Sequence, residues 1–197
     1  MYDYRKLTPA EREAVVRQRL EKGFPRHGPP HPIRDRTYYF LTAACYEHRH
    51  HMRAQARRKT VLEKLREQSE RHGVTLSGWV ILLNHYHILA EVAAFDALGE
   101  FFRFVHGPIA RLWNRLDSRL GRKIWYRYSD RAIRSARHYA VTLNYIHYNP
   151  VKYGWVTSPY DWQESSIHWY EAFYGRDWLR SLWTGHPVRD YGQGWDD

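Results

Sequence analysis

The sequence predicts an α+β fold of the ferredoxin-like, split βαβ type, in which helices cover an antiparallel sheet. Two observations lead to this class. The expected elements follow one another in the order β-α-β-β-α-β-α, and the first six match that plan. A chain of 197 residues with 43% apolar content is also long enough to bury one core. A further helix is expected after the last core strand, and a helical arm before the first strand.

The N-terminal segment is expected to form a helical arm joined to the domain by a linker. Residues 8–22 begin with Thr8, which can cap a helix, and Glu11 stands three residues after that cap. Residues 24–33 are rich in proline and glycine, which predicts an extended linker. The predicted organisation is an arm and linker at 1–35, a domain at 36–174 and an irregular, aromatic tail at 175–197.

The domain is expected to contain four strands and three helices. The strands are predicted at 37–47, 74–83, 85–92 and 123–129 from their β-branched and aromatic composition. The helices are predicted at 57–73, 96–120 and 135–149 from apolar residues at helical spacing. Gly107 and Pro108 should kink or split the second helix, and Pro150 should stop the third.

The composition indicates which class of partner the protein binds and which cellular compartment it occupies. A net charge of +10 with 16% aromatic residues favours nucleic acid as the partner, because basic groups neutralise phosphates and aromatic rings stack on bases. Alternatively, the aromatic residues fill the core of a basic protein. The single cysteine, Cys45, allows no internal disulfide, and the N-terminus lacks an apolar signal-peptide core, which predicts a cytoplasmic protein. No run of about 18 apolar residues is present, so no membrane partner is expected.

The stretch NHYHIL places two histidines on one predicted strand. Because successive side chains of a strand point to opposite faces, His85 and His87 should share one face. Tyr86 and Ile88 should then lie on the other, more apolar face. Neutral imidazole is a common metal ligand, so the pair suggests a metal site. On this pattern alone, two partly exposed histidines at a strand edge are the alternative.

Tyr145 and Asn149 are four residues apart on the last predicted helix, so their side chains should be neighbours. They fall roughly opposite the apolar stripe that includes Leu143 and Ile146. A tyrosine can act as a covalent nucleophile, and an amide oxygen can ligate a hard metal ion. In the simpler interpretation, Tyr145 is one of 16 tyrosines and Asn149 caps the helix before Pro150.

Two motifs, in this order, make the chain resemble the REP-associated tyrosine transposases, which are single-tyrosine HUH endonucleases: NHYHIL and YIHYNPVKYGWV. Members of that family show a strand of the form N-H-[VYF]-H and a later helix of the form Y-I-H-x-N-P-V-K-x-G. Weaker similarity extends over about residues 36–170. The first 35 residues and the Gly107-Pro108 pair depart from the family pattern, but no catalytic position is lost.

The resemblance implies a transesterification on single-stranded hairpin DNA that requires no nucleotide cofactor. Tyr145 would attack a phosphodiester, form a 5′-phosphotyrosine and release a 3′-hydroxyl. His85, His87 and Asn149 would hold Mg²⁺ or Mn²⁺, which suit nitrogen and oxygen ligands without thiolate better than structural zinc does. The chain would then be a metal-dependent DNA endonuclease and strand transferase, acting as a monomer or a homodimer.

Basic residues near the two motifs are candidates for phosphate contacts, although each alone can be an ordinary solvated charge. They are Arg103, Arg111, Arg115, Arg122, Lys123, Arg131, Arg134, Arg137 and Lys152. Two other functions are considered. A domesticated protein could bind DNA hairpins without cleaving them. A two-histidine phosphoesterase would need a second motif of the form H-x-[ST], which the chain lacks.

Overall fold

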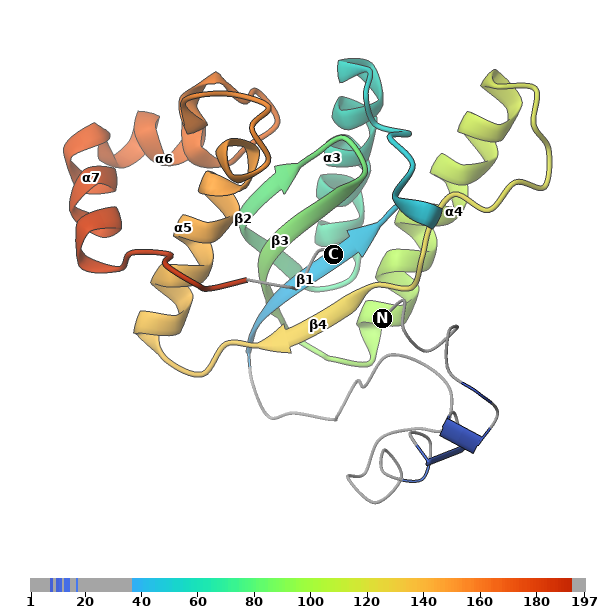
Figure 1. The fold of residues 1–197 in the computed structure, drawn as a ribbon, viewed down its shortest axis with the longest axis horizontal. Coiled ribbons are helices and arrows are strands. Elements are labelled where there is room, and N and C mark those ends of the chain that lie inside the picture. The colour runs from blue at the N-terminus through green and yellow to red at the C-terminus, as the bar shows by residue number, and fades with distance from the viewer. Residues whose placement is uncertain (1–7, 9, 12, 15–16, 18–36, 193–197) are drawn as a thin grey trace. The chain divides into compact units, whose positions relative to one another are not determined.

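Four strands form one antiparallel sheet in the computed structural model, which describes residues 8, 10–11, 13–14, 17 and 37–192 (Figure 1). The strands are β1 (Tyr38–Ala44), β2 (Val74–Ile81), β3 (His85–Val92) and β4 (Ser129–Ala132). Their order across the sheet is β2-β3-β1-β4, and every neighbouring pair is antiparallel. With a helix after β1 and another after β3, this arrangement confirms the predicted ferredoxin-like α+β class.

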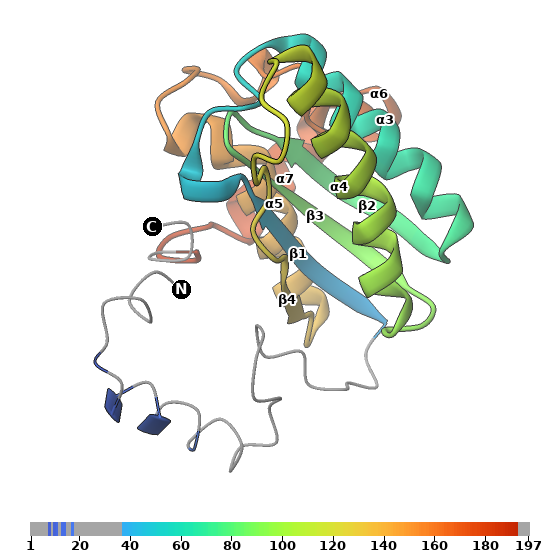
Figure 2. The same ribbon diagram turned by 90° about the vertical axis from the view of Figure 1, so that its right-hand side faces the viewer.

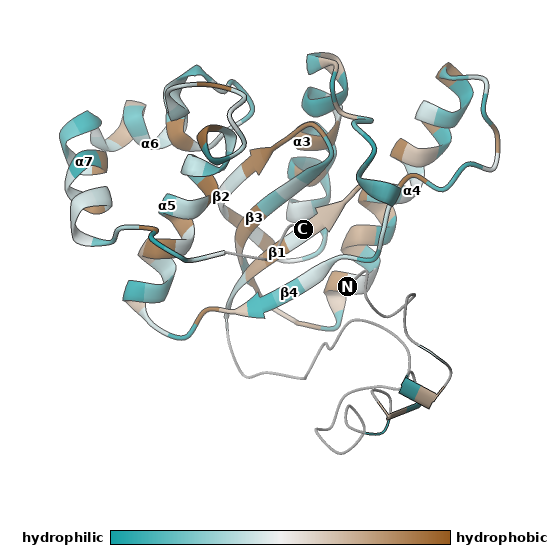
Figure 3. Cartoon of the chain, in the orientation of Figure 1, coloured by the Kyte–Doolittle hydropathy of each residue, from teal (hydrophilic) through white to brown (hydrophobic). Residues whose placement is uncertain are grey.

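The sheet separates two apolar clusters. On one face, α3 (Gln55–Arg71) and α4 (Ala97–Leu116) pack against the strands, and Figure 2 shows these helices side by side. On the other face lie α5 (Ala136–Lys152), α6 (Ile167–Tyr174) and α7 (Arg176–Gly185). Hydrophobic residues recur along the strands between these layers (Figure 3). Helices therefore cover both faces, and the two predicted for the first six elements share one of them.

The fourth strand differs from its prediction. The aromatic run at 123–129 contributes Trp125, which makes only an isolated bridge to Cys45, and regular pairing with β1 begins at Ser129. Ile124 and Trp125 are buried in the core between the sheet, α3 and α4. The apolar and aromatic residues of this run are buried, as their composition suggests. The regular hydrogen bonds to β1, however, are made by the more polar residues that follow.

Neither proline interrupts its helix as predicted. Pro108 lies inside α4, which is one helix from Ala97 to Leu116, so the predicted split is wrong. Pro150 lies inside α5, which continues to Lys152, so the predicted stop at that proline is also wrong. The second departure affects the candidate site, because it leaves Asn149 inside the helix and extends α5 by a further turn.

The C-terminal segment is also more regular than predicted. In this segment, the short 3-10 turn η2 (Pro159–Asp161) precedes α6, and α7 follows α6 after Gly175. A second described 3-10 turn, η1 (Tyr46–His48), lies elsewhere, between β1 and α3. Gly175 has a φ of 81°, a left-handed conformation that glycine adopts readily. Leu179 of α7 is buried against α5 and its neighbours. The tail expected to be irregular thus helps to cover one face of the sheet.

The chain divides into two compact units, residues 1–34 and 35–197. In the first unit, the predicted cap is present: the Thr8 backbone N–H donates to Glu11 Oε2 at 2.7 Å, and the Glu11 N–H donates to Thr8 Oγ1 at 3.3 Å. The Thr8 hydroxyl and the Thr8 backbone N–H both donate to the Glu11 carboxylate, and these two hydrogen bonds lower its pKa. The linker at 24–33 and much of the helix predicted at 8–22 lie outside the described residues, and the domain boundaries at 35 and 174 stay predictions. Within the described parts of the chain, no helix is long and apolar enough to cross a bilayer.

Candidate active site

Strand β3 presents its two histidines to the face of the sheet that α5 covers. His85 and His87 are 3% and 0% exposed, and their ring centroids are 4.8 Å apart. In the register of β1 and β3, they lie opposite Ala44 and Thr42. Tyr86 belongs to the apolar cluster on the opposite face. The predicted alternation is confirmed, and the strand-edge alternative is wrong because β3 is an inner strand and both rings are buried.

Side-chain oxygens orient both imidazoles through their Nδ1 atoms. Asn84 Nδ2 donates to the His48 carbonyl at 3.2 Å, so Asn84 Oδ1 is the atom that faces His85 Nδ1, at 2.8 Å. His85 Nδ1 therefore carries the proton. Thr42 Oγ1 lies 2.8 Å from His87 Nδ1. Metal-binding histidines typically use one ring nitrogen for such an orienting contact, which makes Nε2 the ligand atom.

Tyr145 projects from α5 toward His87. Their ring centroids are 5.6 Å apart, and the Tyr145 ring also lies edge-on to Phe40 at 5.9 Å. The prediction that Tyr145 lies off the apolar side of its helix is wrong, because Tyr145 is 0% exposed and belongs to the apolar cluster with Phe40. α5 has two buried sides, because the sheet covers one and the C-terminal segment covers part of another.

Asn149 follows Tyr145 by one turn of α5 and is fully buried. Its Nδ2 lies 3.4 Å from the Tyr145 carbonyl oxygen, and its Oδ1 accepts no hydrogen bond from any described residue. Since α5 extends to Lys152, Asn149 does not cap the helix. A buried amide oxygen without a donor is costly unless something else satisfies it, and a cation would do so.

His85 and His87 alone are too few ligands for a divalent ion, so a metal site here would also need the amide oxygen of Asn149. No group of three His, Cys, Asp or Glu that could hold a metal ion occurs in the described parts of the chain. Two imidazoles from β3 and the Asn149 oxygen from α5 would supply two nitrogens and one oxygen, and would leave coordination positions for phosphate oxygens and water. These donors fit the ion expected from the sequence.

Lys152 reaches the hydroxyl of Tyr145, a contact that the sequence prediction missed. Lys152 Nζ donates to Tyr145 Oη at 3.2 Å and lies 5.1 Å from the centre of the ring. The two residues are seven apart, which is two turns of one helix. Had α5 been predicted to continue beyond Pro150, this spacing would have signalled the contact.

The turn that follows α7 covers Tyr145. The Tyr191 ring lies 5.6 Å from the Tyr145 ring, and its hydroxyl contacts His138 Nε2 at 2.9 Å and Thr142 Oγ1. Burial raises the pKa of Tyr191, and the hydrogen bond with Thr142 opposes that rise. Gly192 fits against the phenol so closely that a Cβ there would lie 2.3 Å from Tyr145 Cε2.

The basic residues predicted to contact phosphate do not form one group. Arg103, Arg111 and Arg115 are exposed on α4, whereas the histidines and Tyr145 lie on the opposite face of the sheet. Lys123 lies over the rings of Tyr46 and Tyr126, at 4.5 and 5.6 Å. Exposed positions on β4 and around the start of α5 are occupied by Arg131, Arg134 and Arg137. Lys152 and Arg137 lie on α5, which carries Tyr145, Arg134 lies just before that helix, and Arg131 lies on β4, two strands from β3.

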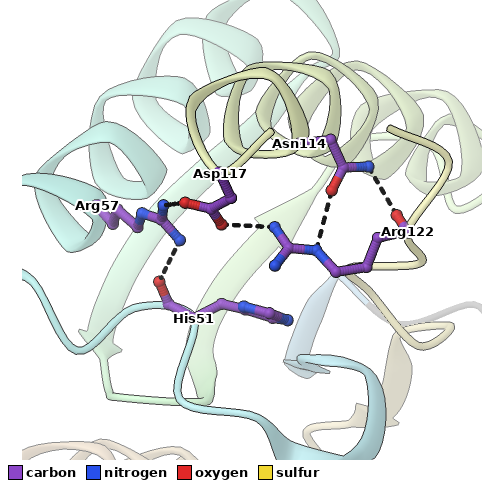
Figure 4. A network of polar contacts seen from close by, with 5 residues as sticks. All are labelled: His51, Arg57, Asn114, Asp117 and Arg122. Atoms are coloured by element: carbon purple, nitrogen blue, oxygen red, sulfur yellow. Dashed lines mark hydrogen bonds and ion pairs between the residues drawn. The ribbon is translucent and has the colours of Figure 1, made fainter. Parts of the chain in front are cut away.

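Arg122 belongs to a polar network that joins α3, α4 and the loop after α4 (Figure 4). It donates to Asp117 at 2.6 Å and to Asn114 at 3.0 Å, and Asp117 also pairs with Arg57. The hydrogen bonds from Arg57 and Arg122 lower the pKa of Asp117 to about 2. Burial lowers the pKa of the nearby His51. Phosphate contact by Arg122 would have to compete with these interactions.

Comparison with known proteins agrees first with the class of fold. A solved structure described as a REP-associated tyrosine transposase bound to a REP hairpin superposes with a TM-score of 0.58 at 22% identity. The match covers 79% of this chain and 88% of the other. The chain therefore has the fold seen in that transposase.

Sequence comparison points to the same family. A REP-associated tyrosine transposase of Escherichia coli (strain K12) is 28% identical over 129 residues, which is 60% of this chain and 67% of the relative. No family model matches the sequence. The predicted resemblance to REP-associated tyrosine transposases is thus confirmed both in sequence and in fold, and the relative is an enzyme of transposition.

Proposed function

We propose that this chain nicks and rejoins single-stranded DNA at a hairpin through a 5′-phosphotyrosine at Tyr145. The observation that carries the proposal is the set of side chains that β3 and α5 present on the side of the sheet that holds Tyr145. Two oriented imidazoles, a buried amide oxygen and a lysine ammonium come from β3 and α5. The names of the similar proteins support a tyrosine transposase and, for the solved one, a hairpin ligand.

The reaction exchanges one phosphate ester for another. Tyr145 Oη forms a bond to phosphorus while the bond from phosphorus to the 3′-oxygen breaks, the phenol proton leaves, and the 3′-oxygen takes up a proton. Attack by a 3′-hydroxyl on the phosphotyrosine reverses these changes and rejoins a strand. Mg²⁺ or Mn²⁺, held by Nε2 of His85, Nε2 of His87 and Oδ1 of Asn149, would polarise the phosphate and offset its developing charge.

One chain supplies every group that this proposal uses. All five residues belong to one chain: ring contacts join His85 to His87 and His87 to Tyr145, and Asn149 and Lys152 follow Tyr145 on the same helix. The proposal therefore requires no second subunit, and of the two oligomeric states expected from the sequence it favours a functional monomer. The net charge of +10 supports DNA as the partner.

One observation favours the alternative, a hairpin-binding protein that does not cleave. Tyr145 is 0% exposed, and the turn at Tyr191 and Gly192 covers its ring. A phosphodiester can reach Tyr145 Oη only after that turn moves. If the turn stays closed on DNA, the chain binds the hairpin and leaves the DNA strand intact.

The test is a covalent-adduct assay with the full-length chain. Labelled single-stranded hairpin DNA is incubated with the protein and Mn²⁺ and resolved on a denaturing gel. We expect an adduct that requires the ion and disappears in Tyr145→Phe, which keeps the ring and removes the nucleophile. Hairpin binding without any adduct would support the non-cleaving alternative, and an undiminished adduct in Tyr145→Phe would show that another group attacks.

A further inference from the structure

Lys152 contacts the phenol oxygen itself, whereas the sequence suggested only a phosphate contact for this residue. Its Nζ donates to Tyr145 Oη at 3.2 Å and is also 3.4 Å from the Gly192 carbonyl oxygen. Lys152 is exposed, as are Arg134 and Arg137 near the N-terminal end of the same helix, but its Nζ is turned to the Tyr145 hydroxyl. Lys152 is placed two turns from Tyr145 because α5 continues through Pro150.

We propose that Lys152 is a catalytic residue that stabilises negative charge on Tyr145 Oη during both cleavage and rejoining; this inference rests on the proposed function. An ammonium group has three donors and no acceptor, so the phenol oxygen must be the acceptor in this contact. A hydrogen bond from an ionised donor is shorter and stronger than one between neutral groups. It strengthens further as the oxygen acquires negative charge.

The effect is easiest to see in rejoining. When a 3′-hydroxyl attacks the phosphotyrosine, the bond between phosphorus and Tyr145 Oη breaks, and its electron pair stays on the phenol oxygen. Lys152 already points a positive charge at that oxygen, so no group has to reorganise as the charge develops. In cleavage, the same charge favours the phenolate that attacks. Lys152 acts only as a hydrogen-bond donor, and protons are exchanged with solvent at the phenol and at the 3′-oxygen.

A lysine suits this position for a geometric reason. The contact is made by one small ammonium group at the end of a flexible chain, and the acceptor is a single oxygen. An arginine fork is matched to the two oxygens of a carboxylate or phosphate. A role at Tyr145 Oη therefore predicts that Lys152→Arg restores the charge but only part of the rate.

The test compares Lys152→Met with Lys59→Met, which makes the same chemical change at an exposed position of α3 on the other face of the sheet. Single-turnover rates of cleavage and rejoining are measured with saturating hairpin DNA and Mn²⁺, alongside hairpin affinity and melting temperature. Removal of a preorganised donor from a reacting oxygen typically costs about 100-fold in rate. We expect a loss of that order in both directions for Lys152→Met, with hairpin affinity nearly unchanged, and no loss for Lys59→Met.

Chemical rescue distinguishes a catalytic ammonium from one that only supports the fold. We expect Lys152→Ala to recover part of its rate when methylammonium is added, and Lys152→Arg to lie between the wild type and Lys152→Met. Weakened hairpin binding with an unchanged rate at saturating DNA would overturn the inference and make Lys152 a phosphate ligand. A rate of adduct formation in Lys152→Met equal to that of the wild type would overturn the inference about Lys152 and leave the proposed function unaffected. Absence of any adduct in the wild type would overturn both.

Discussion

The two faces of β3 bury polar side chains in different ways. On the face toward α3 and α4, Tyr86 Oη and His106 Nε2 are 2.7 Å apart and satisfy each other. The His106 ring stacks on Trp125 with centroids 4.5 Å apart, and burial lowers the pKa of His106 to about 3. This histidine therefore stays neutral and serves the core.

On the opposite face, His85 and His87 meet a different set of neighbours. Each has its Nδ1 oriented by a side-chain oxygen, and their ring neighbours include the phenols of Tyr153 and Tyr145, the second of which accepts from Lys152. Packing alone therefore does not identify a functional histidine, because His106 also packs against aromatic rings of the core. The informative difference is which ring nitrogen is held by the protein and which groups lie beside the other one.

The largest expected effect comes from replacing one histidine on each side of the sheet and comparing the two variants. We expect His87→Ala to reduce Mn²⁺-dependent adduct formation by more than about 100-fold, because it removes a proposed ligand. His106→Ala should keep Mn²⁺ affinity, measured by calorimetry, but lose about 2–3 kcal/mol of folding stability, because the buried Tyr86 hydroxyl loses its partner. Normal cleavage by His87→Ala would show that this histidine is structural, like His106.

A smaller loss is expected from the amide on α5. Asn149→Ala should reduce adduct formation by about 10- to 100-fold, because water can replace one neutral ligand. Asn144→Ala is the matched control, since Asn144 is also a buried amide of α5 but donates to the carbonyls of Leu182 and His186. It should lower the melting temperature without changing Mn²⁺ affinity. Equal Mn²⁺ affinity in both variants would remove Asn149 from the site.

The covering turn should limit the rate to a smaller degree. Gly192 has a φ of 82°, and an added Cβ would overlap the Tyr145 ring, so Gly192→Ala should open the turn. We expect a several-fold faster initial rate of adduct formation. Gly185→Ala serves as the control, because a Cβ there meets nothing within 4 Å and the backbone is helical. A slower rate in Gly192→Ala would mean that the turn helps to position the phenol.

The smallest effect is expected in the network around Asp117, which lies at α3 and α4, away from the candidate site. Its pKa is lowered from 3.8 to about 2, so its ionised form stabilises the fold above about pH 4, and this contribution disappears as the pH falls through about 2. Because Asp117 is 26% exposed, we discount the shift and expect Asp117→Asn to cost about 1–2 kcal/mol at neutral pH. Denaturant unfolding at pH 7 and pH 2.5 checks this. A difference that grows at the lower pH would contradict the assignment.

The sequence predicted the elements that have strong local signals. Alternation along residues 85–92 placed His85 and His87 on one face and Tyr86 on the other, and the Thr8–Glu11 spacing predicted a cap that is present. Two predictions that rested on proline as a helix breaker were wrong. Pro108 and Pro150 both lie in helices that continue, because packing of α4 and α5 against the sheet outweighs the loss of one backbone donor.

The missed parts of the site depend on contacts between distant segments. Tyr145 and Tyr191 are far apart in the chain, and no local pattern indicates that the segment after α7 returns to cover α5. Thr42 is ordinary in a strand, and only the register of β1 with β3 places it beside His87. The contact of Lys152 with Tyr145 was hidden for a local reason, since it required α5 to continue beyond Pro150.

The central claim is that Tyr145, and no other tyrosine, attacks DNA on the α5 side of β3. Its most direct test is tandem mass spectrometry of nuclease-trimmed adducts formed by the wild-type chain with hairpin DNA and Mn²⁺. Since the chain contains 16 tyrosines, the position of the modification is informative. We predict a nucleotide mass on the peptide that contains Tyr145, and none in a reaction without the ion. A nucleotide on any other tyrosine, or hairpin binding with no adduct at all, would contradict the claim.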